Sequence, residues 1–550
     1  MKAPLAVPKL SGFDKSHQNL LTSKVGTITP ILVDELIPGS KVNCKLALGA
    51  SLPPLASDTY MRCSIKCEAF FVPMRLLDGG FEAWFTDEAK DLVDSVSASG
   101  TVSTTSKTAY LPIIRSATPS GTALPWENEI IGTGSLGDYL GFRSGVVNEL
   151  RFTGVSAMPF LAYHRIYNDW YRNSLIQKEC FLPNYPATTP YFGAADSPWI
   201  FHDSSNYIWG APQDLTLADG VRITALRQRN FGMDYFTTAT PQPQQGSPMV
   251  VSFNTSGATG QFSIATLRAA NSMQQFKERN NLLGNLYVEQ LYGRYGVRPS
   301  DGIAQRSLYL GRADFEIYSK GIYQSSNNID SGTTDPTTTT GGHDENPFGC
   351  VGSRFGSAYA SGESFLVNFE AKEPGYLFVM ATLVPRVTYS TGIERYLRHY
   401  MGAGSLSDMA NPILQNVGPQ PIYEYELTGT AGSPLRIFGY TDRYADFKIK
   451  QDTLHGLFRD GQTLDAFALQ RSFASNSLPS INSAFLQIPT DYMDQVTAVQ
   501  QWISQYGYQL DTYFDYKVAM PISKYSLPTL QDPAYEHGRT IVVNRGGSKL

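Results

Sequence analysis

The stretch "MRCSIKCEAFFVP", residues 61–73, alternates apolar and polar side chains, and it limits the possible folds more than any other feature of the chain. One face carries Met61, Cys63, Ile65, Cys67, Ala69 and Phe71, and the other carries Arg62, Ser64, Lys66 and Glu68. A repeat of two residues indicates a β-strand with one face in the core. Cys63 and Cys67 are spaced like a pair of metal ligands, but the alternation predicts that both are core residues.

Three further stretches predict strands near the two ends of the chain. Residues 510–520 alternate in the same way, whereas residues 375–387, "GYLFVMATLVPRV", are apolar without alternation, as expected of a strand covered on both faces. Residues 24–48 predict two short strands interrupted at Pro38 and Gly39. The strong strand signals therefore lie on either side of a large central region.

Helix signals lie mostly in that central region and near the C-terminal end. Apolar side chains recur at steps of three and four residues over 159–178, which predicts one helix that starts at Pro159. A second helix is predicted over much of 263–296, with a break near Gly284, and a third over 491–507.

Composition indicates a β-rich protein with long ordered loops that bury surface against partners. Only 17% of the 550 residues are charged, aromatic residues reach 12%, and the 48 Gly and 33 Pro supply many turns.

The net charge of -5 means that the chain as a whole has no positive field that would attract nucleic acid. Local contacts to phosphate could come from "RITALRQRN", residues 222–230, or from Arg539, Arg545 and Lys549, although a solvated surface is the favoured interpretation for each of these residues. No apolar run is long enough to span a bilayer, and the five scattered cysteines are expected to be reduced thiols.

The sequence predicts no catalytic, cofactor or metal site. The seven histidines are dispersed, and His164, beside the apolar stripe of its helix, is expected to be structural. "GTGSLG", residues 132–137, lacks the strand and helix of a dinucleotide site and is expected to be a turn. "GGHDEN", residues 341–346, could supply oxygen ligands to calcium, but it lies in the Ser/Thr/Gly-rich tract 325–349, which predicts an exposed, mobile loop.

Five blocks of sequence together resemble one protein family. The first is "FDKSHQNLLTSKVGTITPILVDELIPGS", residues 13–40, and the others are "EAFFVPMRLL" (68–77), "MPFLAYHRIYNDWYRN" (158–173), "GMDYFTTATPQPQQG" (232–246) and "FGYTDRYADFKIKQDTLHGLFRD" (438–460). In the same order, these blocks resemble those of the major capsid proteins of Microviridae, the small single-stranded DNA phages. The resemblance runs from about residue 11 to 525.

The resemblance implies a mainly β fold, an eight-stranded antiparallel jelly roll of the viral capsid type, with long insertions that contain helices. The whole of 1–550 would be one protomer, with jelly-roll strands mainly from 20–75 and 355–525 and an insertion over 76–355 that holds the helices near 160–178 and 263–295. The implied function is structural and non-enzymatic: self-assembly into a T=1 icosahedral shell around a circular single-stranded DNA genome.

The implied partners are other copies of the chain, the DNA through an inner surface, a small basic DNA-binding protein, a DNA pilot protein and a bacterial surface receptor. The resemblance places the chain in the virion, after synthesis and assembly in the bacterial cytoplasm. It does not indicate which residues contact DNA.

The chain departs from one branch of the family, the gokushoviruses, whose members usually carry a long insertion after the "PQ-G" element that builds a threefold protrusion. Here only about twenty residues separate Gly246 from the predicted helix, so either the protrusion is absent or the variable surface lies in 95–125, 190–220 or 325–350. The stretch 232–246 is expected to be a strand followed by a proline-stiffened loop at or near a subunit contact.

A carbohydrate-binding or carbohydrate-cleaving β-sandwich is the alternative function, because jelly rolls also host these activities. A phage receptor-binding or tail protein is a third, but the trimeric repeats it would show are not seen in the sequence.

Overall fold

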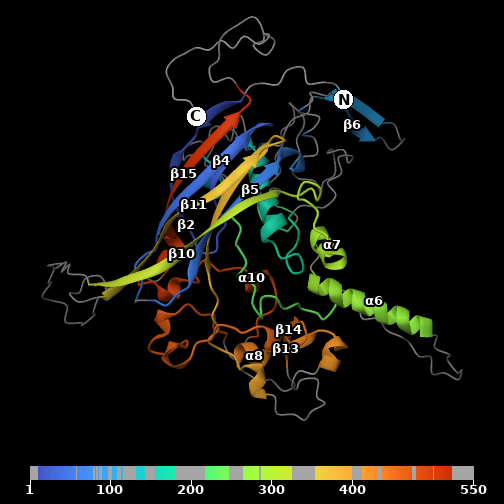
Figure 1. Ribbon diagram of the computed structural model, residues 1–550, viewed down its shortest axis with the longest axis vertical. Helices are drawn as coiled ribbons and strands as arrows, with labels where there is room; N and C mark the ends of the chain where they lie inside the picture. Colours follow the sequence, from blue (N-terminus) through green and yellow to red (C-terminus); the bar gives the residue numbers. More distant parts are fainter. Residues whose placement is uncertain are drawn as a thin grey trace, which may run out of the picture.

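The computed structural model places one curled antiparallel sheet at the centre of the molecule (Figure 1). It describes residues 10–56, 59–77, 81, 85, 90–96, 102–107, 113–114, 132–142, 155–180, 217, 219–246, 264–283, 286–324, 354–398, 412–429, 436–473, 478–498 and 501–522. The strands of the sheet are β1 (Ser11–Asp14), β2 (His17–Ser23), β3 (Thr29–Leu36), β4 (Lys41–Ser51), β5 (Cys63–Pro73), β10 (Leu308–Gln324), β11 (Arg354–Glu370), β12 (Gly375–Pro385) and β15 (Tyr508–Met520).

The order of the strands is β1-β15-β4-β11-β10-β5-β12-β3, and β2 pairs with β15 beside β1. Strands β1 and β2 share one edge of β15, so the sheet is eight strands wide, and every pair in it is antiparallel. Long β10 joins the two halves of the sheet, because its first part pairs with β5 and its last part with β11. This architecture confirms the predicted fold class, a mainly β capsid-type jelly roll with insertions.

Side chains rather than backbone hydrogen bonds connect the two edges of the curled sheet. The Lys15 ammonium lies 2.7 Å from the Asp34 carboxylate of β3, and the Tyr516 hydroxyl of β15 donates to the same carboxylate at 2.7 Å. The Asn19 amide of β2 donates to the Ile31 carbonyl of β3 at 2.8 Å. These contacts bring β2 and β15 beside β3 and leave one core enclosed by the curl.

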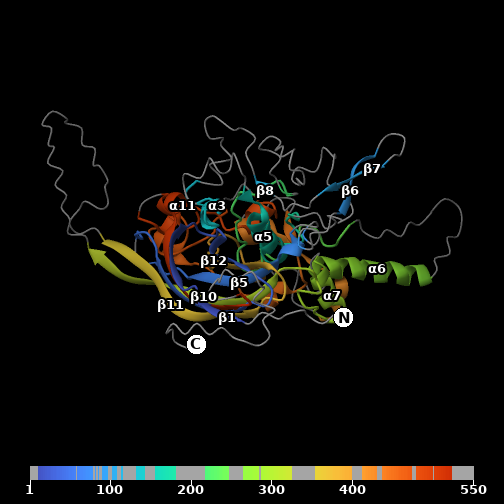
Figure 2. The ribbon, with the colours of Figure 1, turned by 90° about the horizontal axis from the view of Figure 1, so that it is seen from above.

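Strand β12 is buried on both faces, as its uninterrupted apolar sequence predicts. Leu377, Val379 and Ala381 face the core inside the curl. Phe378 and Met380 face a second core, which is covered by α5 (Met158–Ile166) and the π-helical turn η2 (Tyr167–Tyr171). Figure 2 shows α5 lying over β5 and β12, on the side away from β11.

Strands β4 and β15 are buried on one face only, which confirms the alternation seen in residues 510–520. In β15 the buried side chains include Leu510, Phe514 and Val518, whereas Asp511 and Tyr513 are exposed. No described element covers that outer face. We call it the open face of the sheet.

Several other predictions are confirmed by the structure. Cys63 and Cys67 lie on the buried face of β5, and the break predicted between two strands is the turn at Gly39, which has a φ of +85° between β3 and β4. The long helix at 263–296 is two helices, α6 (Ile264–Leu283) and α7 (Tyr287–Tyr295), separated near Gly284 as expected.

Two predictions of secondary structure were wrong. The helix expected over 159–178 ends at 171, because Arg172 is extended and the following residues form turns. The helix expected over 491–507 is only the short turn η8 (Asp494–Val496) and α11 (Trp502–Tyr506), and Gln501 before α11 has a φ of +61°, which no helix accommodates. Strand β10 also belongs to the main sheet, although its residues lie within 76–355, outside the two ranges from which most strands were expected.

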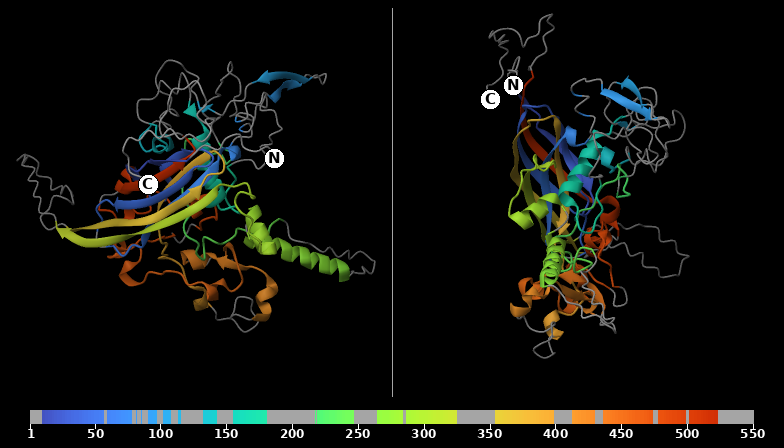
Figure 3. Two further views of the ribbon diagram at one scale, coloured as in Figure 1. Left: turned by 45° about the horizontal axis from the view of Figure 1, so that its top comes forward. Right: turned by 90° about the vertical axis from the view of Figure 1, so that its right-hand side faces the viewer.

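A lower lobe packs below the sheet and has a core of its own (Figures 1 and 3). Its elements are β13 (Gln420–Tyr423), α8 (Glu424–Thr428), β14 (Ile437–Thr441), α9 (Ala445–Lys448) and α10 (Ser483–Leu486). Figure 3 shows α6 extending away from the sheet and the lobe. Among the described helices, none combines the length and the apolar character needed to cross a membrane.

Candidate assembly surface

Cys63 and His164, two groups of the kinds used in catalysis, are buried. Burial raises the pKa of the Cys63 thiol to about 12, so this thiol is protonated at neutral pH. His164 is fully buried, where its Nε2 lies 2.7 Å from the Ile223 carbonyl and its Nδ1 accepts from the Arg227 guanidinium at 2.9 Å. Burial and the Arg227 charge lower the pKa of His164 well below its ordinary value. Within the described ranges no His, Cys, Asp and Glu side chains are grouped so that three could hold a metal ion.

Two arginines of the basic segment 222–230 face neither phosphate nor solvent. Arg227 is 5% exposed and pairs with Asp219 at 2.5 Å. Arg229 pairs with Glu68 of β5 at 2.6 Å. Both expectations for this segment are therefore wrong for Arg227 and Arg229, because these two side chains are used inside the molecule.

Glu68 is the centre of a buried polar cluster between the sheet and the layer that covers it. Its carboxylate accepts from Arg229 at 2.6 Å and from the Tyr171 hydroxyl at 2.7 Å. Burial raises the pKa of Glu68, but the hydrogen bond and charge of Arg229 outweigh burial, so the pKa is lowered overall. The Arg229 guanidinium also lies 5.0 Å from the centre of the Tyr171 ring. The cluster joins three segments that are far apart in the sequence.

The stretch 232–246 has a different local structure from the one expected. Instead of a strand it forms a turn, in which the Asp234 carboxylate accepts from the backbone N–H groups of Phe236 and Thr237, both at 2.8 Å. Tyr235 and Phe236 are buried in the core of the lower lobe. An aspartate at the start of a turn commonly accepts hydrogen bonds from the backbone two and three residues later. Asp234 in "MDYFT" is such a residue, so the local sequence already favoured a turn over a strand.

The proline-containing part of this stretch, residues 241–246, is packed against α6. The Asn281 amide of α6 donates to the Gln242 carbonyl at 2.7 Å, and the amides of Gln274 and Gln244 are hydrogen-bonded to each other. Just before it, Thr240 exchanges two backbone hydrogen bonds of 2.8 Å with Tyr440 of β14. The stretch therefore connects the lower lobe to α6.

Arg471 fixes the lower lobe to the main body through aromatic rings. Its guanidinium carbon lies 4.4 Å from the ring centre of Phe485 and 4.6 Å from that of Phe231, and its NH2 group donates to the Phe485 carbonyl at 2.9 Å. The rings of Phe473 and Tyr389 lie at 5.2 and 5.9 Å. A cation held by aromatic faces is favourable where water is excluded.

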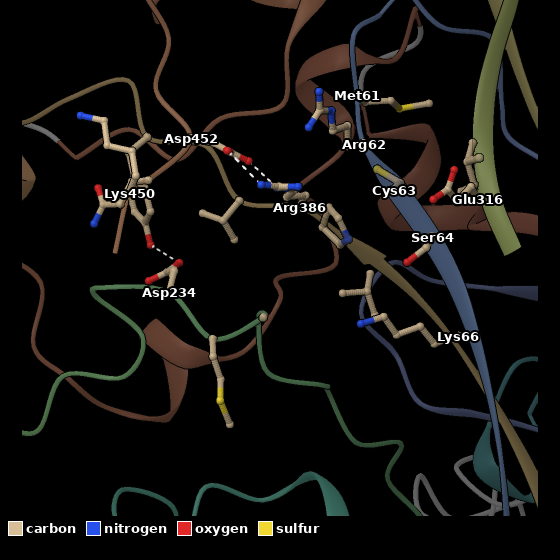
Figure 4. Close-up of a pocket in the computed structure, with 18 of the residues that line it drawn as sticks. Met61, Arg62, Cys63, Ser64, Lys66, Asp234, Glu316, Arg386, Lys450 and Asp452 are labelled. Carbon is tan, nitrogen blue, oxygen red and sulfur yellow. Dashed lines mark hydrogen bonds and ion pairs between the residues drawn. The ribbon is translucent and has the colours of Figure 1, made fainter. Parts of the chain in front are cut away.

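A cleft of about 700 Å³ opens where β5, β10 and β12 meet the lower lobe (Figure 4). In Figure 4 Arg386 points to Asp452, and their side chains form an ion pair. Asp234 on the opposite wall accepts a hydrogen bond from the Tyr389 hydroxyl at 2.9 Å. The carboxylates of this cleft are thus held by neighbouring donors, and the only thiol that lines it is the protonated Cys63. The cleft has no nucleophile paired with a base.

A second hollow, of about 580 Å³, lies on the lower lobe and is bordered by exposed apolar side chains. We call it the groove. Tyr396 is 61% exposed and Leu397 is 62% exposed, and Phe447 and Ile449 are exposed beside them. An exposed set of large apolar and aromatic side chains is typical of a protein interface.

The structure places the remaining candidates as follows. Residues 132–137 form the predicted turn, in which Gly134 has a φ of +74° and Ser135 caps the short helix α3 (Leu136–Tyr139). The calcium candidate at 341–346, the loop 325–349 and the basic residues Arg539, Arg545 and Lys549 lie outside the described residues, as do 190–216, most of 95–125 and 325–350.

Comparison with known proteins identifies relatives over nearly the whole chain. A family model described as "Capsid protein (F protein)" matches residues 6–259 and 248–530. The capsid protein VP1 of Chlamydia phage 1 is 24% identical over 628 aligned positions, which cover 96% of this chain and 97% of the relative. The capsid protein VP1 of Spiroplasma virus 4 is 24% identical, with 94% of each chain covered, and that of Bdellovibrio phage phiMH2K is 25% identical, with 94% of this chain and 95% of the relative covered.

Proposed function

The chain belongs to the capsid protein (F protein) family of Microviridae and is a major capsid protein of a phage in the virion, and we propose that it forms a T=1 icosahedral shell around a circular single-stranded DNA genome. The observation that carries this proposal is the family match over both halves of the chain, in a protein that exposes large apolar side chains on projecting elements. Such side chains lose their contact with water when copies associate.

The proposed shell has the whole chain as one protomer, with the curled sheet as its body and the loop 325–349 at its surface. We also propose that the proline-containing loop 241–246 lies at or near a subunit contact. Its packing against α6 supports this proposal, because that helix extends from the body of the protomer.

The partners proposed for the shell are the DNA on its inner surface, a small basic DNA-binding protein, a DNA pilot protein and a bacterial surface receptor. Assembly would take place in the bacterial cytoplasm. Since Arg227 and Arg229 are used in internal ion pairs, the DNA contacts proposed here do not include them.

Electron microscopy of the purified protein, alone and with the other phage proteins under assembly conditions, tests the shell. Small isometric particles are expected. A protein that stays a monodisperse monomer in the presence of those partners would refute the proposal. Binding to single-stranded DNA should weaken steeply with salt, and an affinity independent of salt would argue against phosphate contacts.

A further inference from the structure

Helix α7 is attached to the protomer on one side and exposes tyrosines on another. The Ser174 hydroxyl donates to the Glu289 carboxylate at 3.0 Å, which holds the helix to the segment after η2. Tyr287 is 68% exposed, Tyr292 is 51% exposed and Tyr295 is 72% exposed. At 3.6 residues per turn the three tyrosines lie within an arc of about 140°, so they share one face of the helix, which we call the tyrosine face. Figure 1 shows α7 at the periphery of the molecule, next to α6.

The chain after α7 folds a cation onto the tyrosine face. Gly296, with a φ of +71°, ends the helix, and its N–H donates to the Tyr292 carbonyl at 2.8 Å. The turn brings the Arg298 guanidinium carbon to 4.4 Å from the centre of the Tyr292 ring. Glu289, on the same helix, is hydrogen-bonded to Ser174. Among the described side chains the face therefore gains one cation, and that cation lies against one of its own rings.

The composition of the tyrosine face and of the segment after it favours a protein as the partner. Tyrosine and arginine are enriched at protein interfaces and among the residues that contribute most to binding, whereas lysine and the acidic residues are depleted. Exposed aromatic rings can also stack on the bases of single-stranded nucleic acid. Val297 is 57% exposed and Ile303 is 78% exposed, and neither has a ring on which a base could stack. Aliphatic side chains are stabilised instead by leaving water against another apolar surface.

The exposed area of the tyrosine face is large enough for the centre of an interface. A fully buried aromatic side chain removes about 150–250 Å² from water. With exposures between one half and three quarters, the three tyrosines together offer roughly 300–450 Å². A stable interface buries about 800 Å² on each partner, so these rings supply about half of one side.

The low charge of the tyrosine face favours a second copy of this chain, placed across a twofold axis. Permanent interfaces between identical chains are more apolar and poorer in charged residues than transient ones. Residues on a twofold axis face their own copies, so a charged side chain there would face a like charge. The open face carries exposed charges such as Lys41 and Asp511, and the groove is lined by charges of both signs. The tyrosine face has the single cation Arg298, which lies against a ring.

We propose that the tyrosine face of one copy of this chain packs against the tyrosine face of a second copy across a twofold axis. This inference rests on the proposed function, because an icosahedral shell of identical chains contains twofold axes. The contact is isologous, so the same side chains are buried on both copies. The rings pack edge to face or offset, the arrangements that aromatic side chains prefer. Since Glu289 holds α7 to Ser174, the contact also sets the angle between the two protomers.

Substitutions of Tyr295 test whether the tyrosine face is needed for assembly. Tyr295→Lys should reduce the yield of particles at least tenfold, because the contact would bury two ammonium groups in an apolar surface. The matched variant Tyr295→Phe keeps the ring and should form particles like the parent chain. The melting temperature of the unassembled chain should stay unchanged in both variants, since this side chain is exposed in the protomer. Particles from Tyr295→Lys at the parent yield would overturn the proposal.

Disulfide trapping tests whether the partner surface is the same face. Chains that carry Tyr287→Cys and Tyr295→Cys together, co-assembled with an equal amount of parent chain and then oxidised, should form covalent dimers, because the new cysteines of both copies lie in the contact. The four described cysteines are buried, and the parent chain and the unassembled variant measure the background. Particles that contain the variant without such dimers would place the tyrosine face against a different surface and would overturn the proposal.

Binding of a fluorescent oligothymidylate to the unassembled chain tests the competing class of partner. The double variant Tyr287→Ala with Tyr295→Ala should bind it like the parent. A tenfold loss of this binding together with a normal particle yield would assign the face to nucleic acid and overturn the proposal. If the parent chain never forms particles, the proposed function fails; if the parent forms particles and Tyr295→Lys does so equally well, only the contact fails.

Discussion

The two halves of the sheet bury their strands in different ways, although one curl contains both. In the half formed by β5, β12 and β3, apolar cores lie on both faces, and the buried charge of Glu68 is matched by Arg229. In the half formed by β11, β4 and β15, the outer face is open and carries charges such as Lys41 and Glu370, whose side chains are more than half exposed. The first half is therefore the fixed interior of the protomer, and the second offers a surface to other molecules.

This difference explains why the same fold needs two kinds of sequence. A strand covered on both faces must be apolar at every position or must pair its polar groups, because burying an unpaired charge is costly. A strand covered on one face needs only alternation, so its outer positions are available for contacts between copies. Helix α6 and the groove carry further exposed apolar side chains outside the sheet.

The largest effect is expected from Arg229→Met, which leaves the Glu68 carboxylate buried without its cation. Removing one partner of a buried ion pair costs about 3–5 kcal/mol in the free energy of unfolding. The urea midpoint should fall accordingly. The double variant Glu68→Gln with Arg229→Met should recover part of the loss, and a double variant no more stable than Arg229→Met would show that the ion pair is not the cause.

Leu377→Ala in β12 should cost about 2–5 kcal/mol, because Leu377 is fully buried in the core inside the curl. Tyr513→Ala on the open face should change the free energy of unfolding of the monomer by less than about 0.5 kcal/mol. Parallel urea titrations of the two variants measure the contrast directly. Equal losses would mean that another part of the chain or another copy covers the open face in solution.

The covered half should also lose stability in mild acid because of His164. The unfolded chain takes up a proton at this residue near its ordinary pKa of about 6.5, whereas the folded chain, with a lowered pKa, does not. Stability is therefore full above about pH 7 and falls as the pH drops below 6.5, by up to about 1.4 kcal/mol per pH unit. Melting temperatures between pH 7.5 and 5 should show a shallower fall in His164→Gln, whereas His455→Gln, which changes an exposed histidine, should behave like the parent.

The smallest effect is expected from Lys41→Met on the open face. Its ammonium lies 3.7 Å from Glu370, and such an exposed pair contributes at most about 1 kcal/mol. Thermal unfolding of the monomer should hardly change at 0.15 M salt. A loss comparable to that of Arg229→Met would contradict the distinction between the two halves.

The strands and the core residues could be predicted from short patterns in the sequence. Alternation in 61–73 and 510–520 placed the buried faces correctly, because side chains in a strand point to opposite sides at every step. The same pattern exists in β10, where Ala313, Phe315 and Ile317 are buried, but no strand was predicted there, in the middle of the mixed insertion expected over 76–355.

The exposed surfaces and the buried polar clusters could not be predicted in the same way. The arginines of 222–230 were predicted to form a surface patch. Nothing in the local sequence shows that Asp219 and Glu68 form ion pairs with two of them. The early end of the helix at 171 also coincides with contacts to distant segments, such as the hydrogen bonds of Tyr171 with Glu68 and Asn230. The groove is formed by residues 235–459, which no short window contains.

The sequence by itself determined strands β3, β4, β5, β12 and β15, the buried faces of β5 and β15, and the family to which the blocks in their order belong. These properties are local, because they depend on neighbours one to four residues away or on short sequence motifs. Only the tertiary structure decided which charges are paired inside, how β10 joins the two halves, and where α6 and the groove lie. Those properties depend on the curl that brings the two ends of the chain together, and the free energy that selects the curl is summed over contacts between residues hundreds of positions apart.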